Sequence, residues 1–353
     1  MKATGIVRRI DDLGRVVIPK EIRSRTMRIR EGDPLEIYTT RDGEVIFKKY
    51  SLIGGLEEFA AQFCDTLSRS TDFSAAVTDR DAVIAMENPT YRQAYRVLSG
   101  VGHKVLPVGI DKNGFCVKEL EGQDVQAAYV MPSHQFPTGI VMPVKRRQGL
   151  LSWAGELPGR YLIEDDYDSE FRYQGKPIPA MQGLDDGENV IYTGTFSKAI
   201  APAIRVCYMV LPQKLVKQYQ KIGRTFSCAV SRIDQKVLTM FLTEGHFERH
   251  LNRMRNIYKE KHDQLIISLK KLDSKIKIYG HGAGAHIIVS FPVNDPYKFQ
   301  KELKQRGVMI YPLSWYYIEG KPSTEEYILG FTRMKKEDMI RGIEIIREVL
   351  YSK

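Results

Sequence analysis

The 353-residue sequence is poor in the residues that staple secreted domains or hold metal ions. It contains only four cysteines, and these are far apart in the chain: Cys64, Cys116, Cys207 and Cys228. Since no pair has the spacing of a zinc or redox motif, we expect reduced thiols. His246 and His250 are four residues apart, as metal ligands can be on a helix, but no third ligand accompanies them. No metal site is therefore predicted.

Long apolar runs are also missing. No run reaches the roughly 20 residues that a membrane-spanning helix needs, and the N-terminus has no signal-peptide pattern. Hydrophobic residues make up 43% of the chain and charged residues 27%, which is ordinary for a globular protein. These features predict a cytoplasmic protein without a membrane segment, long enough for two or three domains.

Negative charge is scarce near the N-terminus. The formal net charge of the chain is +10, and residues 1–50 contain 12 Lys and Arg against 8 Asp and Glu, an excess of +4. Between Arg8 and Arg30 there are eight basic residues against three acidic ones. A local basic excess suits an anionic polymer, although a solvated surface has the same composition.

Short predicted strands fill residues 1–50. The runs TGIVRRI, RVVIPK, PLEIYTT and EVIFKKY have strand composition, and the turns DDLG, EGDP and RDG separate them. One or two helical turns are expected after Glu21. Because strands of this length bury too little surface to fold alone, we expect a partner chain.

The string GIVRRIDDLGRVVIPKEIR resembles the AbrB/SpoVT-type DNA-binding domain, and the resemblance covers nearly all of residues 1–50. It implies an intertwined dimer of swapped hairpins that contacts double-stranded DNA from loops and strand ends. The arginines that it assigns to DNA are Arg8, Arg9, Arg15, Arg23 and Arg25. Ser24 departs from the family pattern as a one-residue insertion, which in a helix rotates the following Arg25 by about 100°.

Residues 51–85 are predicted to be a linker helix and a junction. Apolar residues recur there at helical spacing, at Ile53, Leu56, Phe59, Phe63 and Leu67. Core packing and a dimer contact are both compatible with this face. The following SAAVTDRDAVIA resembles the first strands of the sensor domain in SpoVT-type regulators. That resemblance stops within one strand, which indicates a fusion point.

From about residue 86 onward, strands and helices alternate. KVLPVGI, AAYVMP, RYLIEDD, NVIYTG and RVCYMVLP predict buried strands in α/β order. Residues 214–255 are predicted largely helical, and the helix continues over 258–272. HIIVSFP, VMIYPL and EYILGF predict strands of a smaller α+β domain that ends in the helix KKEDMIRGIEIIREVL. We expect a large domain over 86–245 and a C-terminal region over 246–353.

The segment YTGTFSKAIAPAIR, residues 192–205, combines Lys198 with hydroxyl residues before it and Arg205 after it. A lysine that forms a Schiff base needs a shielded, electropositive setting. An aldehyde cofactor that carries a phosphate needs hydroxyls, an arginine and a carboxylate, and the upstream run IEDDYDSEF supplies carboxylates. For a bare Ser-Lys pair, a surface lysine in a polar loop is the alternative.

Together with ENPTY and PSHQFPTG, this segment resembles the fold-type I pyridoxal-phosphate aminotransferases, in particular the aminotransferase-like domain of MocR/GabR-type regulators. The implied cofactor is pyridoxal 5'-phosphate. Lys198 would form the Schiff base and carry protons, and Tyr167 would bond the phenolic oxygen. Asp165 would pair with the ring nitrogen, with the adjacent Asp166 as its rival. The other residues that the resemblance places at the cofactor are Tyr91, Thr195, Ser197 and Arg205, with His134 and Gln135 as neighbours.

The resemblance is incomplete at its start. The family's Gly-Ser/Thr loop opens a helix whose backbone N–H groups hold the phosphate, and no such loop occurs between residues 51 and 86. Ala203 and Cys207 replace glycines that the family prefers. Leu329 stands where the family has a carboxylate-binding arginine, with Arg333 as a weak substitute. Charge-assisted hydrogen bonds contribute roughly 1.5–3 kcal/mol each, so losing two or three would weaken cofactor binding by orders of magnitude.

Three hypotheses fit these observations. The first is a nucleoid-associated transcription regulator, a homodimer or higher homo-oligomer, whose aminotransferase-like body senses an amino-acid-like effector or merely assembles the protein. The second is a pyridoxal-phosphate aminotransferase that carries a DNA-binding segment and is impaired by the missing loop. The third is a relic fusion with a poorly folded body. The first is preferred because it accounts for both halves of the chain.

Overall fold

The computed structural model describes residues 35–39, 45–49, 82–175, 178–223, 228–322 and 324–352. The chain divides into two units, Met1–Leu67 and Ser68–Lys353. The predicted domain boundaries after residues 50, 85 and 245 stay predictions.

In the first unit, two strands form an antiparallel pair. β1 (Leu35–Thr39) and β2 (Val45–Lys49) align with Thr39 opposite Val45. They coincide with the predicted runs PLEIYTT and EVIFKKY, which are rich in β-branched and aromatic residues. The swapped hairpins, the junction helix and the five arginines assigned to DNA lie outside the described residues.

The second unit contains a seven-stranded sheet. Its strands are β3 (Val83–Asn88), β4 (Lys104–Asp111), β5 (Gly114–Phe115), β6 (Ala127–Val130), β7 (Tyr161–Asp166), β8 (Val190–Thr195) and β9 (Cys207–Val210). Their spatial order is β5-β4-β3-β6-β7-β8-β9. The five inner strands are parallel, and the two edge strands are antiparallel to their neighbours.

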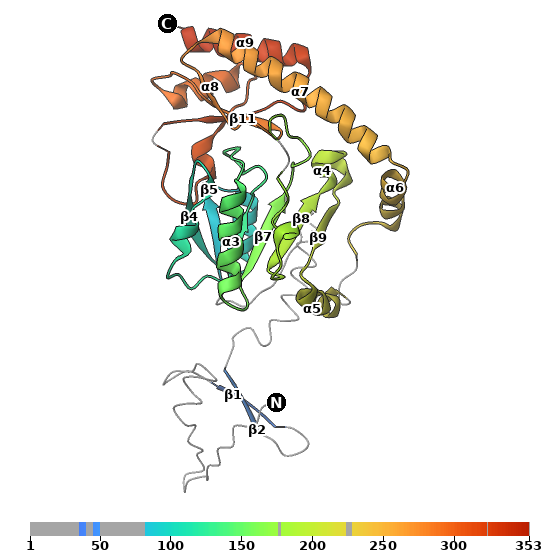
Figure 1. Ribbon diagram of the computed structural model, residues 1–353. Coiled ribbons are helices and arrows are strands. Elements are labelled where there is room, and N and C mark those ends of the chain that lie inside the picture. The colour runs from blue at the N-terminus through green and yellow to red at the C-terminus, as the bar shows by residue number, and fades with distance from the viewer. Residues whose placement is uncertain are drawn as a thin grey trace. The chain divides into compact units, whose positions relative to one another are not determined.

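Helices cover both faces of this sheet. On one face, α3 (Val144–Glu156) packs Leu150 and Trp153 against the buried residues of β6, β7 and β8 (Figure 1). On the other, α2 (Arg92–Gly100) packs Tyr95 and Leu98 against Met86 and its neighbours. The result is a three-layer α/β arrangement, as the alternating pattern predicts. Four short helical segments link the strands: η2 (Val117–Leu120), η3 (Gln182–Leu184), α4 (Phe196–Ala199) and η4 (Pro202–Ile204).

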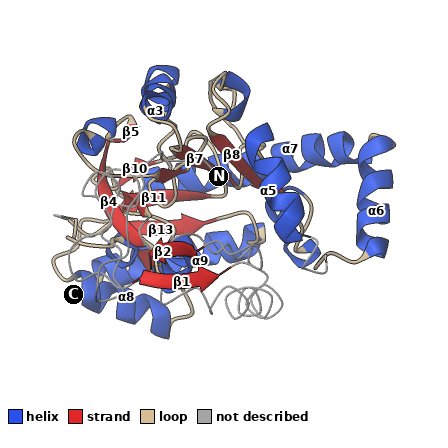
Figure 2. Cartoon of the chain, turned by 90° about the horizontal axis from the view of Figure 1, so that it is seen from below, coloured by secondary structure: helices blue, strands red, loops and turns tan. Residues whose placement is uncertain are grey.

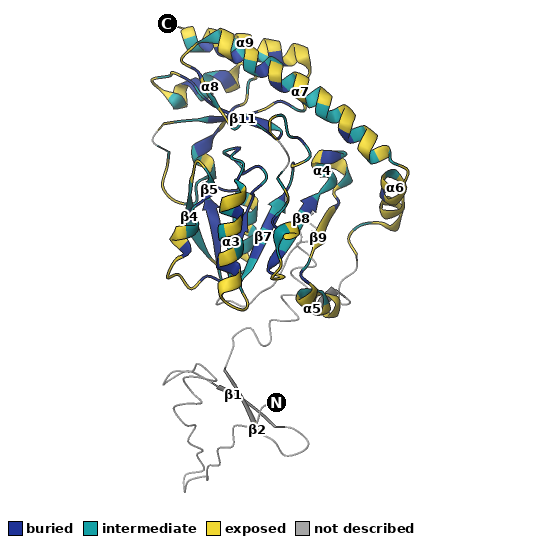
Figure 3. Cartoon of the chain, viewed as in Figure 1, coloured by how far each residue is buried: buried dark blue, intermediate teal, exposed yellow. Residues whose placement is uncertain are grey.

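A smaller antiparallel sheet forms the core of the C-terminal region. It consists of β10 (Lys277–Tyr279), β11 (His286–Ser290), β13 (Tyr327–Gly330) and β12 (Tyr311–Pro312), in that spatial order. Around it lie α7 (His246–Leu272), α8 (Pro296–Gln305), η5 (Leu313–Tyr316) and α9 (Lys336–Tyr351). Leu269, Ile287 and Phe331 belong to one core cluster of buried residues in this region. Figure 3 marks the buried residues in dark blue. The predicted α+β character of this region is confirmed.

Two further helices connect the large sheet to α7. α5 (Gln213–Gly223) follows β9, and α6 (Arg232–Thr243) follows α5. Figure 2 shows α6 at the periphery, beyond the end of the large sheet. α7 is continuous over 27 residues. No helix in the described part of the chain is long and apolar enough to cross a membrane.

The prediction that RVCYMVLP is a buried strand was wrong. All four residues of β9 are exposed, and Tyr208, Met209 and Val210 keep 38–43% of their surface. β9 is the last strand of the sheet, so only β8 lies beside it among the described residues. An apolar run identifies a strand, but burial depends on neighbours that are distant in sequence.

Candidate functional site

The predicted site residues gather where the inner parallel strands end. Asp165 is near the end of β7, Thr195 is the last residue of β8, and Tyr91 follows β3 by three residues. Parallel strands point their carboxyl ends to one edge of a sheet, and ligands of α/β proteins bind in the crevice outside that edge. The topology thus brings together residues that are up to 104 positions apart.

The geometry distinguishes the two adjacent aspartates. Successive side chains of a strand point to opposite faces, so Asp165 and Asp166 cannot serve the same group. Asp166 accepts hydrogen bonds from the Tyr192 hydroxyl at 2.8 Å and from the Ser169 N–H at 3.1 Å. Asp165 faces the other way and accepts one from the Tyr129 hydroxyl. Asp165 therefore shares a face with the other cluster residues.

Burial is the main cause of an unusual ionisation at Asp165. It raises the pKa of this carboxyl to about 6, the Tyr129 hydrogen bond opposes the rise, and the negative charges of Asp166 and Asp168 add to it. A carboxyl of this kind can share a proton with a basic ring nitrogen near neutral pH.

Glu87 is a second buried carboxyl in the cluster, and the sequence analysis missed it. Its Oε2 accepts hydrogen bonds from the Met131 N–H at 3.2 Å and from Gln135 Nε2 at 3.4 Å. Among the residues that the structure describes, its Oε1 is buried without a hydrogen-bond partner. Burial raises the pKa of Glu87 to about 8, so the side chain is mostly protonated at neutral pH. The signal in the sequence was a lone acid at the end of the apolar run VIAMEN.

His134 joins Tyr167 to the acidic run. Its Nδ1 lies 3.0 Å from the Tyr167 hydroxyl and 3.0 Å from Asp168 Oδ2. His134 and Asp168 are both buried. A Cβ on Gly284, whose φ is +80°, would lie 1.9 Å from His134 Cε1. The sequence placed His134 only as a neighbour of the ring, whereas the structure shows it fixing the phenol of Tyr167.

Lys198 is presented by a short helix immediately after β8. The Thr195 hydroxyl caps α4 by accepting a hydrogen bond from the Ser197 N–H at 3.1 Å. The Lys198 side chain is exposed. Burial lowers the pKa of His286 to about 4, and the charges of His134 and Lys198 contribute to this shift. Lys198 is therefore close enough to His286 for its charge to act on that ring.

Arg205 has a left-handed backbone, with φ of 47° and ψ of 37°. Such a conformation is uncommon for a residue with a side chain, and it concentrates at functional sites. Burial and the negative charge of Asp165 raise the pKa of the Tyr91 phenol, and the positive charge of Arg205 opposes the rise. Tyr91 thus lies near both Asp165 and Arg205.

Aromatic rings form one wall of the cluster around Phe136. Its ring centre lies 5.1–6.2 Å from the ring centres of Tyr316, His286, Tyr91 and Tyr167. The five rings come from five separate segments of the chain. Such a wall can contact the face or edge of a flat ligand.

A buried arginine, Arg147, holds the start of the PSHQFPTG loop by hydrogen bonds to backbone carbonyl oxygens. Arg147 donates to the carbonyl oxygens of Pro132 at 2.8 Å, Met142 at 3.1 Å and Pro179 at 2.9 Å. Glu164 Oε1 lies 3.9 Å from its Nη1 and also accepts from the Met181 N–H. The sequence gave no sign of this pair, because its partners are backbone atoms far away in the chain.

The proposed substrate arginine follows β13 in the chain. Leu329 is buried in the core of the small domain, and Arg333 is exposed, with its charge close to Tyr258 on α7.

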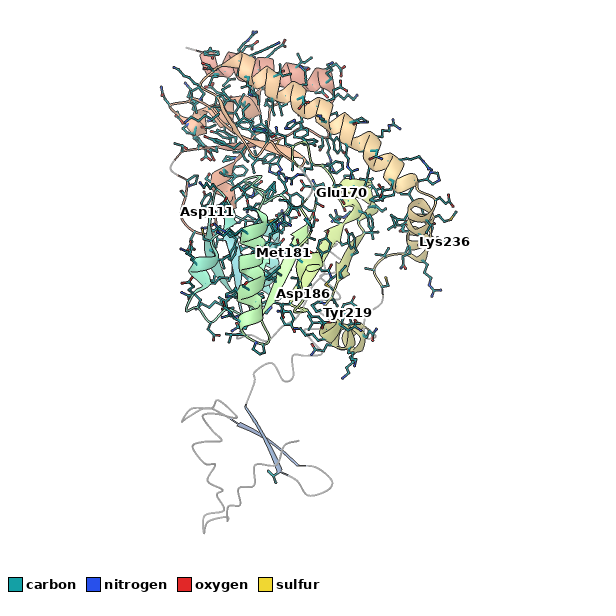
Figure 4. The ribbon with its side chains drawn as sticks, in the orientation of Figure 1. Asp111, Glu170, Met181, Asp186, Tyr219 and Lys236 are labelled. Carbon is teal, nitrogen blue, oxygen red and sulfur yellow. The ribbon has the colours of Figure 1, made fainter. Side chains whose placement is uncertain are left out.

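Glu170, beside α4 in Figure 4, is half-buried, and burial raises its pKa to about 7. Within the described residues, no group of three or more His, Cys, Asp or Glu side chains could hold a metal ion.

Comparison with known proteins agrees with the fold and the cluster. A family model described as aminotransferase class I and II matches residues 13–328. The chain belongs to this family. The solved structure of Pyrococcus horikoshii kynurenine aminotransferase superimposes with a TM-score of 0.70 at 23% identity, covering 94% of this chain and 78% of the other. At that identity, the likeness shows the aminotransferase fold alone.

Relatives of this aminotransferase-like chain include several named regulators. The uncharacterized HTH-type transcriptional regulator YdeL of Bacillus subtilis is 36% identical over 75% of this chain and 57% of the relative. The probable rhizopine catabolism regulatory protein MocR of Rhizobium meliloti is 31% identical over 77% and 55%. The chain therefore spans a little more than half the length of these relatives.

A separate match covers the beginning of the chain. Stage V sporulation protein T of Bacillus subtilis is 67% identical over 86 residues, which are 24% of this chain and 48% of that protein. The predicted fusion of an AbrB/SpoVT-type segment with a MocR-like aminotransferase domain is confirmed.

The described residues fit one end of the pyridoxal phosphate on which this aminotransferase family depends. Asp165 offers a carboxylate for the ring nitrogen, and the Phe136 wall offers a flat apolar surface. Arg205 and the hydroxyl residues before Lys198 offer groups for the phosphate. Among the described residues, no helix N-terminus of the family's phosphate loop is present.

Proposed function

We propose that the chain is a transcription regulator that binds double-stranded DNA through its first 50 residues. The observation that carries this is the 67% identity to stage V sporulation protein T over 86 residues. Relatives of the remaining body are themselves named transcriptional regulators. The regulator would act in the cytoplasm at the nucleoid.

Arginines of the head would make the DNA contacts. The residues proposed for this are Arg8, Arg9, Arg15, Arg23 and Arg25. An arginine fork pairs with phosphate oxygens or with a guanine edge, and phosphate contacts supply most of the affinity. The affinity for DNA should therefore fall steeply as the salt concentration rises.

The body would bind pyridoxal 5'-phosphate and respond to an amino-acid-like effector. The ring, when bound, acts as an electron sink. Asp165 would hold the proton of the ring nitrogen, and Tyr167, fixed by His134, would donate to the phenolic oxygen. Arg205, Thr195 and Ser197 would hold the phosphate, and Tyr91 would border the ring. Lys198 would anchor the cofactor and carry a proton at Nζ.

An aminotransferase is the second candidate function. The closeness of Tyr167 to Asp165, and of Lys198 to His286, favours it. Against efficient turnover, the Lys198 side chain is exposed, whereas an amine nucleophile works best when it is desolvated. The regulator hypothesis therefore remains the better supported of the two.

Salt-dependent DNA binding tests the main proposal. Fluorescence anisotropy of the full chain on duplex DNA between 50 and 300 mM KCl should show affinity that falls steeply, by roughly one unit of log-log slope per phosphate contact. Arg8→Ala with Arg9→Ala should weaken binding and flatten that slope. Lys270→Ala with Lys271→Ala removes the same charge from the exposed end of α7 and should leave both unchanged. Absence of binding at 50 mM salt would refute the proposal.

A further inference from the structure

A cavity of about 270 Å³ opens on the small domain, between α8, β12 and η5. Its lining includes Tyr297, Lys301, Lys304, Met309, Tyr311 and Trp315. None of them belongs to the cluster around Lys198. The next residue after Trp315 is Tyr316, whose ring packs on Phe136 at 5.1 Å. The cavity is thus one residue away from the aromatic wall of that cluster.

The cavity has an unusually apolar rim for a solvent-facing surface. Tyr297 is 75% exposed, Met309 61% and Trp315 56%. The rings of Tyr311 and Trp315 meet edge to face, with centres 6.3 Å apart. Isolated exposed apolar residues are common, but several gathered around one hollow mark a binding surface. Aromatic side chains of this kind lose little conformational entropy when they bind a flat partner.

The charge on the rim has one sign. Lys301 and Lys304 are three apart on α8 and so lie on the same side of the helix. In the described part of the chain, no Asp or Glu lines the cavity. Two nearby acidic residues have other partners: Glu302, also on α8, pairs with Lys298, and Glu325 accepts hydrogen bonds from Ser314, the residue before Trp315. Within the described part of the chain, neither Lys301 nor Lys304 has an ion-pair partner.

We propose that this cavity binds a small aromatic carboxylate. The ring would lie on Trp315 and Tyr297, where offset or edge contacts between rings are favourable. The carboxylate would face Lys301 and Lys304, whose ammonium groups form charge-assisted hydrogen bonds with it. The volume admits a single ring with a short substituent, since pockets for drug-sized ligands begin near 300 Å³. Such a ligand would act on the body without occupying the cluster around Lys198.

The tryptophan content allows a direct measurement. The chain has two tryptophans, and Trp153 is buried with 5% exposure, so a ligand in the cavity meets Trp315 alone. The probe is benzoate, added to the full chain while tryptophan fluorescence is recorded. We expect saturable quenching with half-saturation at about 1 mM or lower, the range that ligand-efficiency limits allow for nine non-hydrogen atoms. Trp315→Phe should remove this saturable component.

Matched variants separate charge from apolar contact. Lys301→Gln with Lys304→Gln should raise the half-saturating benzoate concentration at least about tenfold, because the carboxylate loses both partners. Lys270→Gln with Lys271→Gln makes an equal charge change on α7 and should leave the half-saturating benzoate concentration unchanged. Benzyl alcohol, a neutral molecule of similar size, should bind more weakly than benzoate and be insensitive to both pairs of substitutions.

Three results would overturn the proposal. They are quenching that rises linearly with benzoate, equal binding of benzyl alcohol and benzoate, and equal loss in the two lysine variants. The exposed lysines can be replaced without threatening the fold, so a negative result is not ascribable to unfolding. The measurement involves no DNA, and its outcome is therefore independent of the proposed regulator function.

Discussion

At the scale of residues, the cluster depends on side chains that hold other side chains. His134 fixes Tyr167 and touches Asp168, and Arg147 fixes three carbonyl oxygens beneath the PSHQFPTG loop. Buried polar networks stabilise most when every member is satisfied, and among the described residues the Nε2 of His134 is buried without a hydrogen-bond partner. Because Gly284 has no side chain, its backbone can lie close to the His134 ring without a clash.

Gly284→Ala tests the importance of that approach. An alanine Cβ would clash with His134 Cε1 at 1.9 Å and would also carry the strain of φ +80°. Gly122→Ala is a matched control, because Gly122 has φ +73° and nothing within 4 Å of an added Cβ. We expect Gly122→Ala to cost about 1–2 kcal/mol and Gly284→Ala about 2 kcal/mol more, measured by urea unfolding of the full chain. Equal losses would show that His134 moves aside freely.

At the scale of elements, β9 and α6 expose apolar surface that their neighbours in the described structure do not cover. On α6, Ile233 is 76% exposed, Val237 60% and Met240 45%, and their spacing of four and three residues puts them on one stripe. A 12-residue helix has little stability alone, and its apolar stripe favours packing against another surface. This supports the proposed homo-oligomer and offers α6 as one of its contact elements.

Val237→Glu should weaken self-association of the full chain. A charge on the stripe loses the burial of a valine, worth about 1.5 kcal/mol, which corresponds to roughly a tenfold larger dissociation constant. Thr239→Glu places the same charge about 200° away around the helix and should have little effect. Sedimentation equilibrium measures both variants. If Thr239→Glu weakened association as much as Val237→Glu, general charge repulsion would explain the result and the stripe would not.

At the scale of the whole molecule, two sequence families meet in one chain. The first 86 residues match a sporulation regulator, and the aminotransferase family model reaches residue 328. The body is folded around its own cores in both the large sheet and the small domain. A folded body of this kind argues against the relic hypothesis.

Cofactor binding by the intact chain is the prediction at this scale. Added pyridoxal phosphate should give the full chain a visible absorption band that Lys198→Ala abolishes, because only an amine at the cluster can hold the aldehyde there. Lys236→Ala, on the peripheral helix α6 (Figure 4), should retain the band. A band of equal strength in Lys198→Ala would indicate nonspecific lysine adducts. No band in the wild type would leave the body as an assembly or sensor domain without this cofactor.

The sequence by itself determined the two families, the α/β order and the residues that match the family pattern around Lys198. These are local properties, carried by short strings such as GIVRRIDDLGRVVIPKEIR and YTGTFSKAIAPAIR and by apolar periodicity. It also placed Asp165 and Asp166 in one acidic run, but it had no means of choosing between them.

Tertiary structure alone decided which side chains meet. The side chains of Asp165 and Asp166 point to opposite faces of the sheet because successive residues of a strand alternate. The hydrogen bond from Tyr129 identifies the face on which Asp165 lies. Glu87, His286 and Arg147 join the cluster or its support through contacts 15 to 149 residues apart. β9 is exposed because it is the last strand of its sheet, a fact of strand order rather than of composition. Burial and partnership depend on long-range packing, which no local pattern contains.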